Sequence, residues 1–185
     1  MGYFCAIEIP DKTVQALDQY DLSCLQDKNI KTQRRSDLHI TLSYMGDLSK
    51  DTARKLQDTL HDIQIPRFEV ETKGGCYFPP GTGYRNHFFC AQNVLMPELA
   101  DLKSAIDQIC TSIGVTSARP EKHYTPHITL ARTDHALESE TVEHFLTQNQ
   151  GVTLPSFPVT SFGLFQSLPP RPYIKIEEYM FDKPI

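Results

Sequence analysis

The tetrapeptide His-Ile-Thr-Leu occurs twice in this chain, at residues 39–42 and at residues 127–130. Each copy lies in an apolar stretch that is typical of a β-strand, in which successive side chains point to opposite faces. His39 and Thr41 therefore share one face of their strand, and His127 and Thr129 do the same. A single histidine beside a threonine on a strand is usually structural, but two copies indicate two imidazoles and two hydroxyls that serve one site.

Two facing imidazoles can perform chemistry that one cannot. An unperturbed histidine is close to half protonated at neutral pH, so one ring can accept a proton while its partner donates one. A phosphodiester suits this arrangement, because in-line displacement needs a base at the incoming oxygen and an acid at the leaving oxygen. The hydroxyls of Thr41 and Thr129 would bind the non-bridging phosphate oxygens. This scheme requires neither a metal ion nor a cofactor.

The duplication extends beyond the tetrapeptide. Tyr-Phe-Cys-Ala at residues 3–6 is echoed by Phe-Phe-Cys-Ala at residues 88–91, and each copy precedes an expected helix and then a His-x-Thr strand. We therefore predict internal repeats at roughly residues 1–75 and 86–167. Residues 1–185 should form a single bilobal domain, in which a pseudo-two-fold axis turns the two motifs toward each other across a central cleft.

Hydrophobic periodicity predicts an α+β fold, with antiparallel sheets lining the cleft and helices outside. Strands are expected at residues 3–9, 38–45, 68–71, 88–94, 127–132, around 159–165 and at 173–180. Helices are expected to begin at residue 10 and to span about 50–63, 97–113 and 139–148. Glycine and proline in segment 74–83 favour a loop between the repeats.

Composition narrows the class of protein. The 185 residues, 39% of them hydrophobic, are enough to bury a core. A net charge of −5 argues against tight binding along a long RNA, where affinity comes mostly from neutralised phosphates. A short substrate remains compatible, with local help from basic residues near the motifs, namely Arg34, Arg35, Lys122 and Arg132.

Five cysteines without a Cys-x-x-Cys pair predict neither a disulfide framework nor a zinc site. No apolar stretch approaches the roughly 18 residues of a membrane span, and the N-terminus lacks the features of a signal peptide. We expect a cytoplasmic monomer that binds no metal and no membrane.

Both motif strands resemble those of a known enzyme family. Asp-Leu-His-Ile-Thr-Leu-Ser-Tyr-Met-Gly at 37–46 and Pro-His-Ile-Thr-Leu-Ala-Arg at 126–132 are similar to the signature strands of the two-histidine (2H) phosphoesterases. The nearest resemblance is to the RNA 2',3'-cyclic phosphodiesterases, also called 2'-5' RNA ligases. It implies a bilobal fold with a V-shaped cleft and hydrolysis of an RNA 2',3'-cyclic phosphate to a 2'-phosphomonoester. It also implies that His39 is the proton donor and His127 the proton acceptor, an order that the residues alone leave open.

Arg132 matches the Leu-Ala-Arg ending of the family's second motif, so a contact with the substrate phosphate is expected. Strict alternation places His127, Thr129 and Ala131 on one face of the strand. Arg132 would then start on the opposite face and would have to reach round the end of the strand.

Two tyrosines, Tyr44 and Tyr124, flank the motifs. Either ring could stack on a nucleobase, although packing within the sheet is the default for each. Three functions stay open: hydrolysis of RNA 2',3'-cyclic phosphate ends, phosphodiesterase action on 2'-5' linked oligonucleotides or another small cyclic phosphate with possible reverse ligation, and a non-catalytic RNA-binding module. Intact histidine and threonine in both motifs favour the enzyme.

Overall fold

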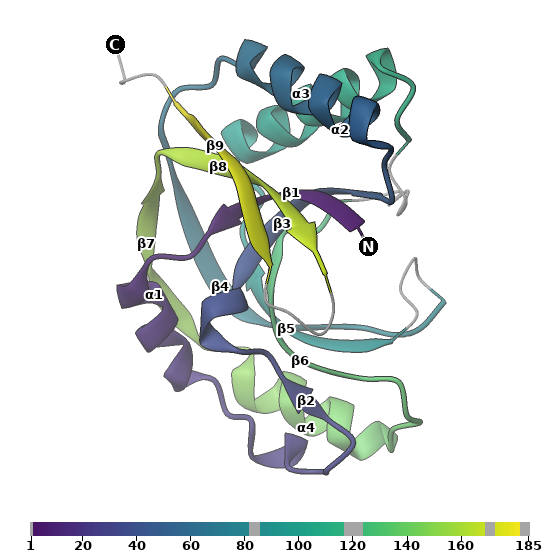
Figure 1. Ribbon diagram of the computed structural model, residues 1–185. Coiled ribbons are helices and arrows are strands. Elements are labelled where there is room, and N and C mark those ends of the chain that lie inside the picture. The colour runs from purple at the N-terminus through teal and green to yellow at the C-terminus, as the bar shows by residue number, and fades with distance from the viewer. Residues whose placement is uncertain (1, 82–85, 117–123, 169–172, 182–185) are drawn as a thin grey trace.

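A computed structural model describes residues 2–81, 86–116, 124–168 and 173–181 and contains an antiparallel sheet flanked by helices (Figure 1). The strands are β1 (Gly2–Glu8), β2 (Lys31–Thr32), β3 (His39–Gly46), β4 (Phe68–Phe78), β5 (His87–Asn93), β6 (His127–Thr133), β7 (Thr153–Val159), β8 (Ser161–Ser167) and β9 (Ile174–Met180). The α-helices are α1 (Asp11–Ala16), α2 (Lys50–Thr59), α3 (Pro97–Ser112) and α4 (Ser139–Asn149). Short 3-10 turns are η1 (Leu17–Gln19), η2 (Ser23–Leu25), η3 (Arg35–Asp37) and η4 (Leu60–Asp62).

The sheet runs in the order β7-β4-β5-β6-β3-β1-β8-β9, and β2 adds to β6. At its centre, β3 and β6 are joined through one residue pair, Ile40 opposite Ile128, whereas the flanking strands pair over most of their length. We call β3-β1-β8-β9 the first lobe and β6-β5-β4-β7 the second lobe. Because the junction is so narrow, the two lobes diverge from the point where the two His-x-Thr strands meet (Figure 1).

Each lobe draws its strands from both sequence repeats. β4 follows the first His-x-Thr strand in the chain but pairs with β5 and β7 of the second lobe. β8 follows the second motif but pairs with β1 of the first lobe. The helices cross over in the same way, because α1 packs on β7 and α3 packs on β3. The two predicted repeats therefore contribute strands to both lobes.

The core lies on the sheet face opposite the histidines. Ile40 and Ile128, which separate His from Thr in the two motifs, are fully buried there. They belong to a cluster that includes Leu102 of α3 and Phe145 of α4. Burial of the aliphatic residues of both motifs turns their polar partners outward.

Both motif strands carry an extra residue at the same place. In the pairing of β1 with β3, Cys5 lies opposite Ser43 and Ala6 opposite Thr41, so Leu42 is the inserted residue. In the pairing of β5 with β6, Leu130 is inserted in the same way between Thr129 and Ala131. A β-bulge of this kind reverses the alternation of the side chains that follow it. Both repeats therefore change face directly after the His-x-Thr-Leu sequence.

The structure confirms the α+β class and the antiparallel sheet, but several predicted boundaries were wrong. The strand expected around 159–165 corresponds to β8, whereas β7 was not predicted. β7 lies at the sheet edge, where its prolines are tolerated. β4 runs on to Phe78 through part of the expected loop, since Gly74, with a φ of 76°, accommodates a register shift. The helix expected from residue 10 ends at Ala16 and passes into 3-10 turns. β2 was not predicted, because two residues carry no periodicity.

Candidate active site

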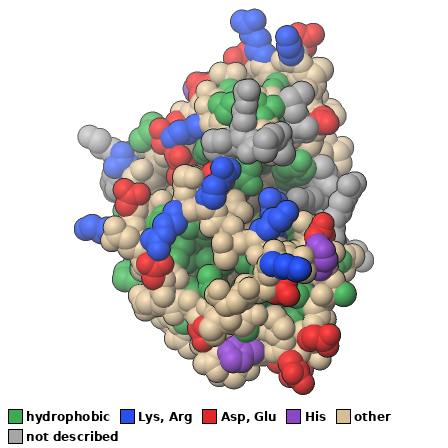
Figure 2. Space-filling view, turned by 60° about the horizontal axis from the view of Figure 1, so that its bottom comes forward, with side chains coloured by type: hydrophobic (Ala, Val, Ile, Leu, Met, Phe, Trp, Pro, Cys, Tyr) green, Lys and Arg blue, Asp and Glu red, His purple; other side chains and the backbone are tan. Residues whose placement is uncertain are grey.

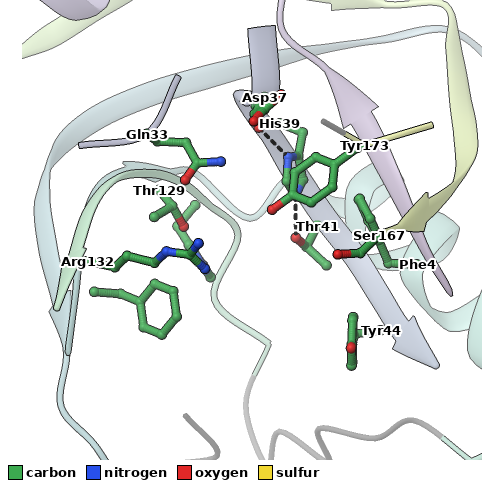
Figure 3. A pocket seen from close by; sticks show the side chains of 12 residues that line it. Phe4, Gln33, Asp37, His39, Thr41, Tyr44, Thr129, Arg132, Ser167 and Tyr173 are labelled. Atoms are coloured by element: carbon green, nitrogen blue, oxygen red, sulfur yellow. Dashed lines mark hydrogen bonds between the residues drawn. The ribbon is translucent and has the colours of Figure 1, made fainter. Parts of the chain in front are cut away.

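The polar residues of the two motifs converge on one cleft of about 220 Å³ between the lobes (Figure 3). Its lining comes from both motif strands, both lobes and the segment that leads into β3, and consists of Phe4, Gln33, Asp37, His39, Thr41, Tyr44, Phe88, His127, Thr129, Arg132, Ser167 and Tyr173. All five residues expected at the site from sequence are among them. The narrow junction between β3 and β6 is what brings the two motifs together.

His39 is fixed by hydrogen bonds at both ring nitrogens. Its Nδ1 lies 2.7 Å from the carbonyl oxygen of Asp37, an acceptor, so Nδ1 carries the proton in the neutral ring. Its Nε2 lies 3.0 Å from the Thr41 hydroxyl, which then donates to it. The ring is thereby oriented with Nε2 and Thr41 side by side in the cleft (Figure 3).

His127 is held by an equivalent bond. Its Nδ1 lies 2.8 Å from the carbonyl oxygen of Thr125, which again stands two residues before the histidine. Its ring packs on Phe78 with 4.6 Å between centroids. Because backbone carbonyls engage Nδ1 in both rings, Nε2 is the nitrogen through which each can exchange a proton with a substrate.

Burial controls the charge of His39. Its ring packs against Phe4, with 5.0 Å between centroids, and meets Tyr173 edge-on at 5.2 Å. Removal from water lowers the pKa of His39 to about 4, and the nearby His127 also lowers it. The hydrogen bond to the Asp37 carbonyl and the negative charge of the Asp37 carboxylate act in the opposite direction. In the free protein, His39 is therefore neutral at pH 7.

Arg132 reaches the cleft by a route that strict alternation did not predict. The bulge at Leu130 reverses the alternation of β6, so Ala131 is fully buried and Arg132 joins Thr129 on the cleft face. The expectation that Arg132 reaches round the end of the strand was therefore wrong. Tyr44 stands at the matching position of the first motif and also lines the cleft, whereas its neighbour Ser43 is buried.

Tyr124 does not line this cleft. Its hydroxyl donates to the Thr41 carbonyl at 2.9 Å, and the Lys103 ammonium lies 5.5 Å from its ring centroid. In the second lobe, the backbone amide of Gln33 donates to the Leu130 carbonyl at 2.8 Å. Each of these bonds connects a neighbouring segment to one motif strand. Tyr124 therefore supports the position of β3 and does not face the substrate cleft.

Several lining residues were not assigned from the sequence. Two of them lie on strands of the first lobe, Phe4 on β1 and Ser167 on β8. Tyr173 precedes β9, and Gln33 follows β2. None of them lies in the two His-x-Thr motifs, although Phe4 belongs to the repeated Phe-Cys-Ala segment, and their positions follow from long-range strand pairing. No role was predicted for Asp37. The sequence nevertheless shows a difference between the motifs, because an acidic residue stands two positions before His39 but not before His127.

Two of the four basic residues expected to help binding are paired with carboxylates. Arg34 forms an ion pair with Asp37 at 2.7 Å, and Arg35 pairs with Asp18 at 2.5 Å. Lys122 lies outside the described residues. Lys and Arg side chains nevertheless gather near the middle of the face shown in Figure 2, with Asp and Glu mostly toward its edge. Arg132 is the cation that lines the cleft within the described part of the chain.

Other site types find little support. Within residues 2–81, 86–116, 124–168 and 173–181, no three His, Cys, Asp or Glu side chains are grouped as a metal site would require. Nor does any helix of these residues combine the length and the apolar character needed to cross a bilayer. All five cysteines fall in the described segments and are free thiols.

Comparison with known proteins agrees with this geometry. The profile of the 2'-5' RNA ligase superfamily matches residues 9–168. A protein of Aeropyrum pernix named RNA 2',3'-cyclic phosphodiesterase is 30% identical over 139 residues, which cover 75% of this chain and 77% of that protein. A crystal structure from Thermus thermophilus superposes with a TM-score of 0.76 at 21% identity, over 97% of both chains. Escherichia coli LigT in complex with 3'-AMP has a TM-score of 0.74 at 18% identity, also over 97% of both. These two structures support the fold.

Proposed function

Because the chain belongs to the 2'-5' RNA ligase superfamily, an enzyme family, we propose that it hydrolyses RNA 2',3'-cyclic phosphate ends to 2'-phosphomonoesters. The observation that carries this proposal is the pairing of two imidazoles in one cleft, each with Nδ1 bound to a backbone carbonyl. A relative at 30% identity bears the name of this activity, which supports the substrate class.

In the proposed reaction, His127 is the proton acceptor and His39 the proton donor. His127 removes a proton from water as the oxygen attacks phosphorus, and the bond from phosphorus to the 3' oxygen breaks. His39 gives its proton to that oxygen, so the products are a 3' hydroxyl and a 2' phosphate. His127 ends the cycle charged and His39 neutral, and exchange with solvent restores both. General acid and base groups of this kind typically contribute about 10²–10⁴-fold each to rate.

The donor role of His39 depends on the substrate's charge. In the free protein the pKa of His39 is about 4, so the ring is neutral at pH 7. A bound phosphodiester brings a negative charge next to the imidazole, which favours the protonated form. Substrate binding would therefore be coupled to proton uptake by His39.

Thr41, Thr129 and Arg132 would hold the non-bridging phosphate oxygens. Both hydroxyls and both histidines line the cleft. Arg132 lies beyond the bulge on the same face as Thr129 (Figure 3). A guanidinium can form a charge-assisted pair with the phosphate. Thr41 would exchange its bond to His39 Nε2 for one to the substrate when that nitrogen becomes protonated.

The charge of the chain supports a short substrate. The net charge of −5, and the pairing of Arg34 and Arg35 with carboxylates, weaken attraction to a long RNA backbone. Recognition would rest on the terminal cyclic phosphate and its nucleoside. A 2'-5' linked oligonucleotide is the second candidate substrate, because the superfamily is named after that linkage. Formation of a 2'-5' bond by ligation is the reverse of its cleavage by a phosphodiesterase.

We also propose that the protein acts as a monomer in the cytoplasm, in keeping with its five free thiols.

A short RNA ending in a 2',3'-cyclic phosphate, incubated with the protein in excess chelator, tests the proposal. The expected product is a 2'-phosphomonoester, identified by ³¹P NMR, at a rate that chelation does not change. A parallel reaction with a 2'-5' linked dinucleotide distinguishes the two candidates. Turnover of neither substrate would refute the proposed activity, and turnover of the dinucleotide alone would replace the first candidate with the second.

A further inference from the structure

The two histidines share a motif but not the side chain that precedes it. Two residues before each ring, Asp37 and Thr125 both give a backbone carbonyl to Nδ1, at 2.7 and 2.8 Å. The first histidine therefore follows a carboxylate and the second an uncharged hydroxyl. Within an otherwise repeated arrangement, this is a difference in charge at equivalent positions.

The Asp37 carboxylate is held firmly and is shielded from water. The Asp37 side chain is 5% exposed, yet it lines the cleft. Its Oδ2 accepts from Arg34 Nε at 2.8 Å and from Arg34 Nη2 at 2.7 Å, and its Oδ1 accepts from the Ser36 hydroxyl at 3.2 Å. The Arg34 side chain is 58% exposed, so water screens the guanidinium better than the carboxylate. The Asp37 carboxylate is therefore the less screened member of this ion pair.

The segment that holds Asp37 also connects the lobes. β2 pairs with β6 of the second lobe, Gln33 donates to the Leu130 carbonyl, and η3 then leads directly into β3. Asp37 closes η3, with its amide bonded to the Arg34 carbonyl at 2.9 Å. The carboxylate is thus placed by contacts to both motif strands rather than by its own side-chain conformation alone.

Other charged and titratable groups face His39 from the elements packed around it. They are His127 and Arg132 of β6, Tyr44 of β3, Tyr173 ahead of β9, the ion pair of Glu8 with Lys175, Asp11 of α1, and Arg35 of η3, which is paired with Asp18. Among these groups, the charge of His127 opposes a positive charge on the His39 ring, whereas the Asp37 carboxylate favours one.

We propose that Asp37 is the positioning residue that makes the two histidines unequal, because its buried carboxylate stabilises positive charge on His39 and so assigns His39 the donor role. This inference rests on the proposed function and adds the physical basis for an order that the repeated motif cannot supply. Phe4 and Tyr173 shield the His39 ring from water. The negative charges of the substrate phosphate and of Asp37 together stabilise the protonated ring.

Two substitutions separate this electrostatic role from a structural one. Asp37→Asn keeps the shape and a bond to Arg34 but removes the negative charge. Arg34→Gln removes the compensating cation and leaves the carboxylate. If the pair merely closes the turn, both variants should behave alike; if charge matters, they should shift the protonation of His39 in opposite directions. Asp134→Asn, which alters an exposed carboxylate beyond the end of β6, is the matched charge control.

The readout is the pH profile of kcat with a mononucleoside 2',3'-cyclic phosphate, which is too small to test backbone binding. We choose kcat because it reports the protonation of the two histidines in the substrate complex. A carboxylate within about 4–6 Å typically shifts a pKa by about one unit or more. Asp37→Asn should therefore move the alkaline limb about one unit down, with kcat about tenfold lower on that limb, whereas Arg34→Gln should move it up and Asp134→Asn should leave it in place. Equal shifts in both variants, or movement of the acid limb instead, would overturn the proposal.

A second readout does not depend on activity. The His39 imidazole proton, identified by its loss in His39→Gln, can be titrated by NMR in the presence of inorganic phosphate. The titration midpoint should fall in Asp37→Asn and rise in Arg34→Gln. If the protein proves inactive on cyclic phosphates but these shifts occur, the proposed function fails while the role of Asp37 stands. Unchanged midpoints in both variants would overturn that role even in an active enzyme.

Discussion

Protonation of His39 should destabilise the folded protein, and the size of this effect can be worked out. The ring packs between Phe4 and Tyr173, and burial lowers the pKa of His39 from 6.5 to about 4. In the unfolded chain the pKa returns to about 6.5. The unfolded state therefore binds the proton more tightly, and the stability linked to His39 is fully present above about pH 6.5 and is lost as the pH falls toward 4.

At pH 5, this linkage amounts to about 2 kcal/mol relative to pH 7.5, from roughly 1.4 kcal/mol per pH unit. Because part of the ring faces the cleft, a measured value of about 1–2 kcal/mol is expected. The assay is urea unfolding at both pH values for the wild type and for His39→Gln. The free energy of unfolding should fall less in the variant, by this amount.

His144→Gln is the matched control, since it removes an exposed imidazole that lies on α4. Inorganic phosphate should reduce the loss at pH 5, because an anion in the cleft stabilises the charged ring. Parallel behaviour of wild type and His39→Gln would refute the reasoning, as it would mean that His39 titrates equally in the folded and unfolded states.

Three further outcomes are expected. Arg132→Gln should lower kcat/KM for a cyclic phosphate by about 10–100-fold through loss of a charged hydrogen bond. Because Arg132 is exposed, the melting temperature should not change. An unaltered kcat/KM would exclude the phosphate contact. Thr41→Val and Thr129→Val, nearly isosteric, should each reduce kcat/KM about tenfold or more, and steady-state kinetics that matched the wild type would contradict hydroxyl binding. Phe145→Ala removes a fully buried ring whose centroid lies 5.1 Å from that of Phe89, and should cost about 3–5 kcal/mol in denaturant unfolding; a cost below about 1 kcal/mol would mean that this core position repacks freely.

The sequence predicted the centre of the site because strand periodicity holds through all four residues of each His-Ile-Thr-Leu motif. His39 and Thr41 share a face, as do His127 and Thr129, and the buried Ile40 and Ile128 mark the opposite face. The same period fails one residue later, since an inserted leucine in each strand changes the face. Bulges depend on the register with a neighbouring strand, which a single sequence does not display.

Residues distant in sequence account for what was missed. Tyr173 meets the His39 ring only because the C-terminal strands β8 and β9 extend the first lobe beside β1. Gln33 reaches the cleft because a two-residue strand pairs with β6, a contact too short for any pattern to indicate. The early end of α1 has a local cause, because isolated helical turns gain little without an extended apolar face to bury.

The central claim, that His39 and His127 act as a pair on one phosphodiester, is tested most directly by a double-mutant cycle. The measurement is kcat for hydrolysis of a 2',3'-cyclic phosphate by the wild type, His39→Ala, His127→Ala and the double variant. Groups that act as one unit are strongly non-additive, so each single variant should lose about 10²–10⁴-fold and the double variant scarcely more. Independent losses that multiply in the double variant, or a single variant with wild-type turnover, would contradict the paired mechanism.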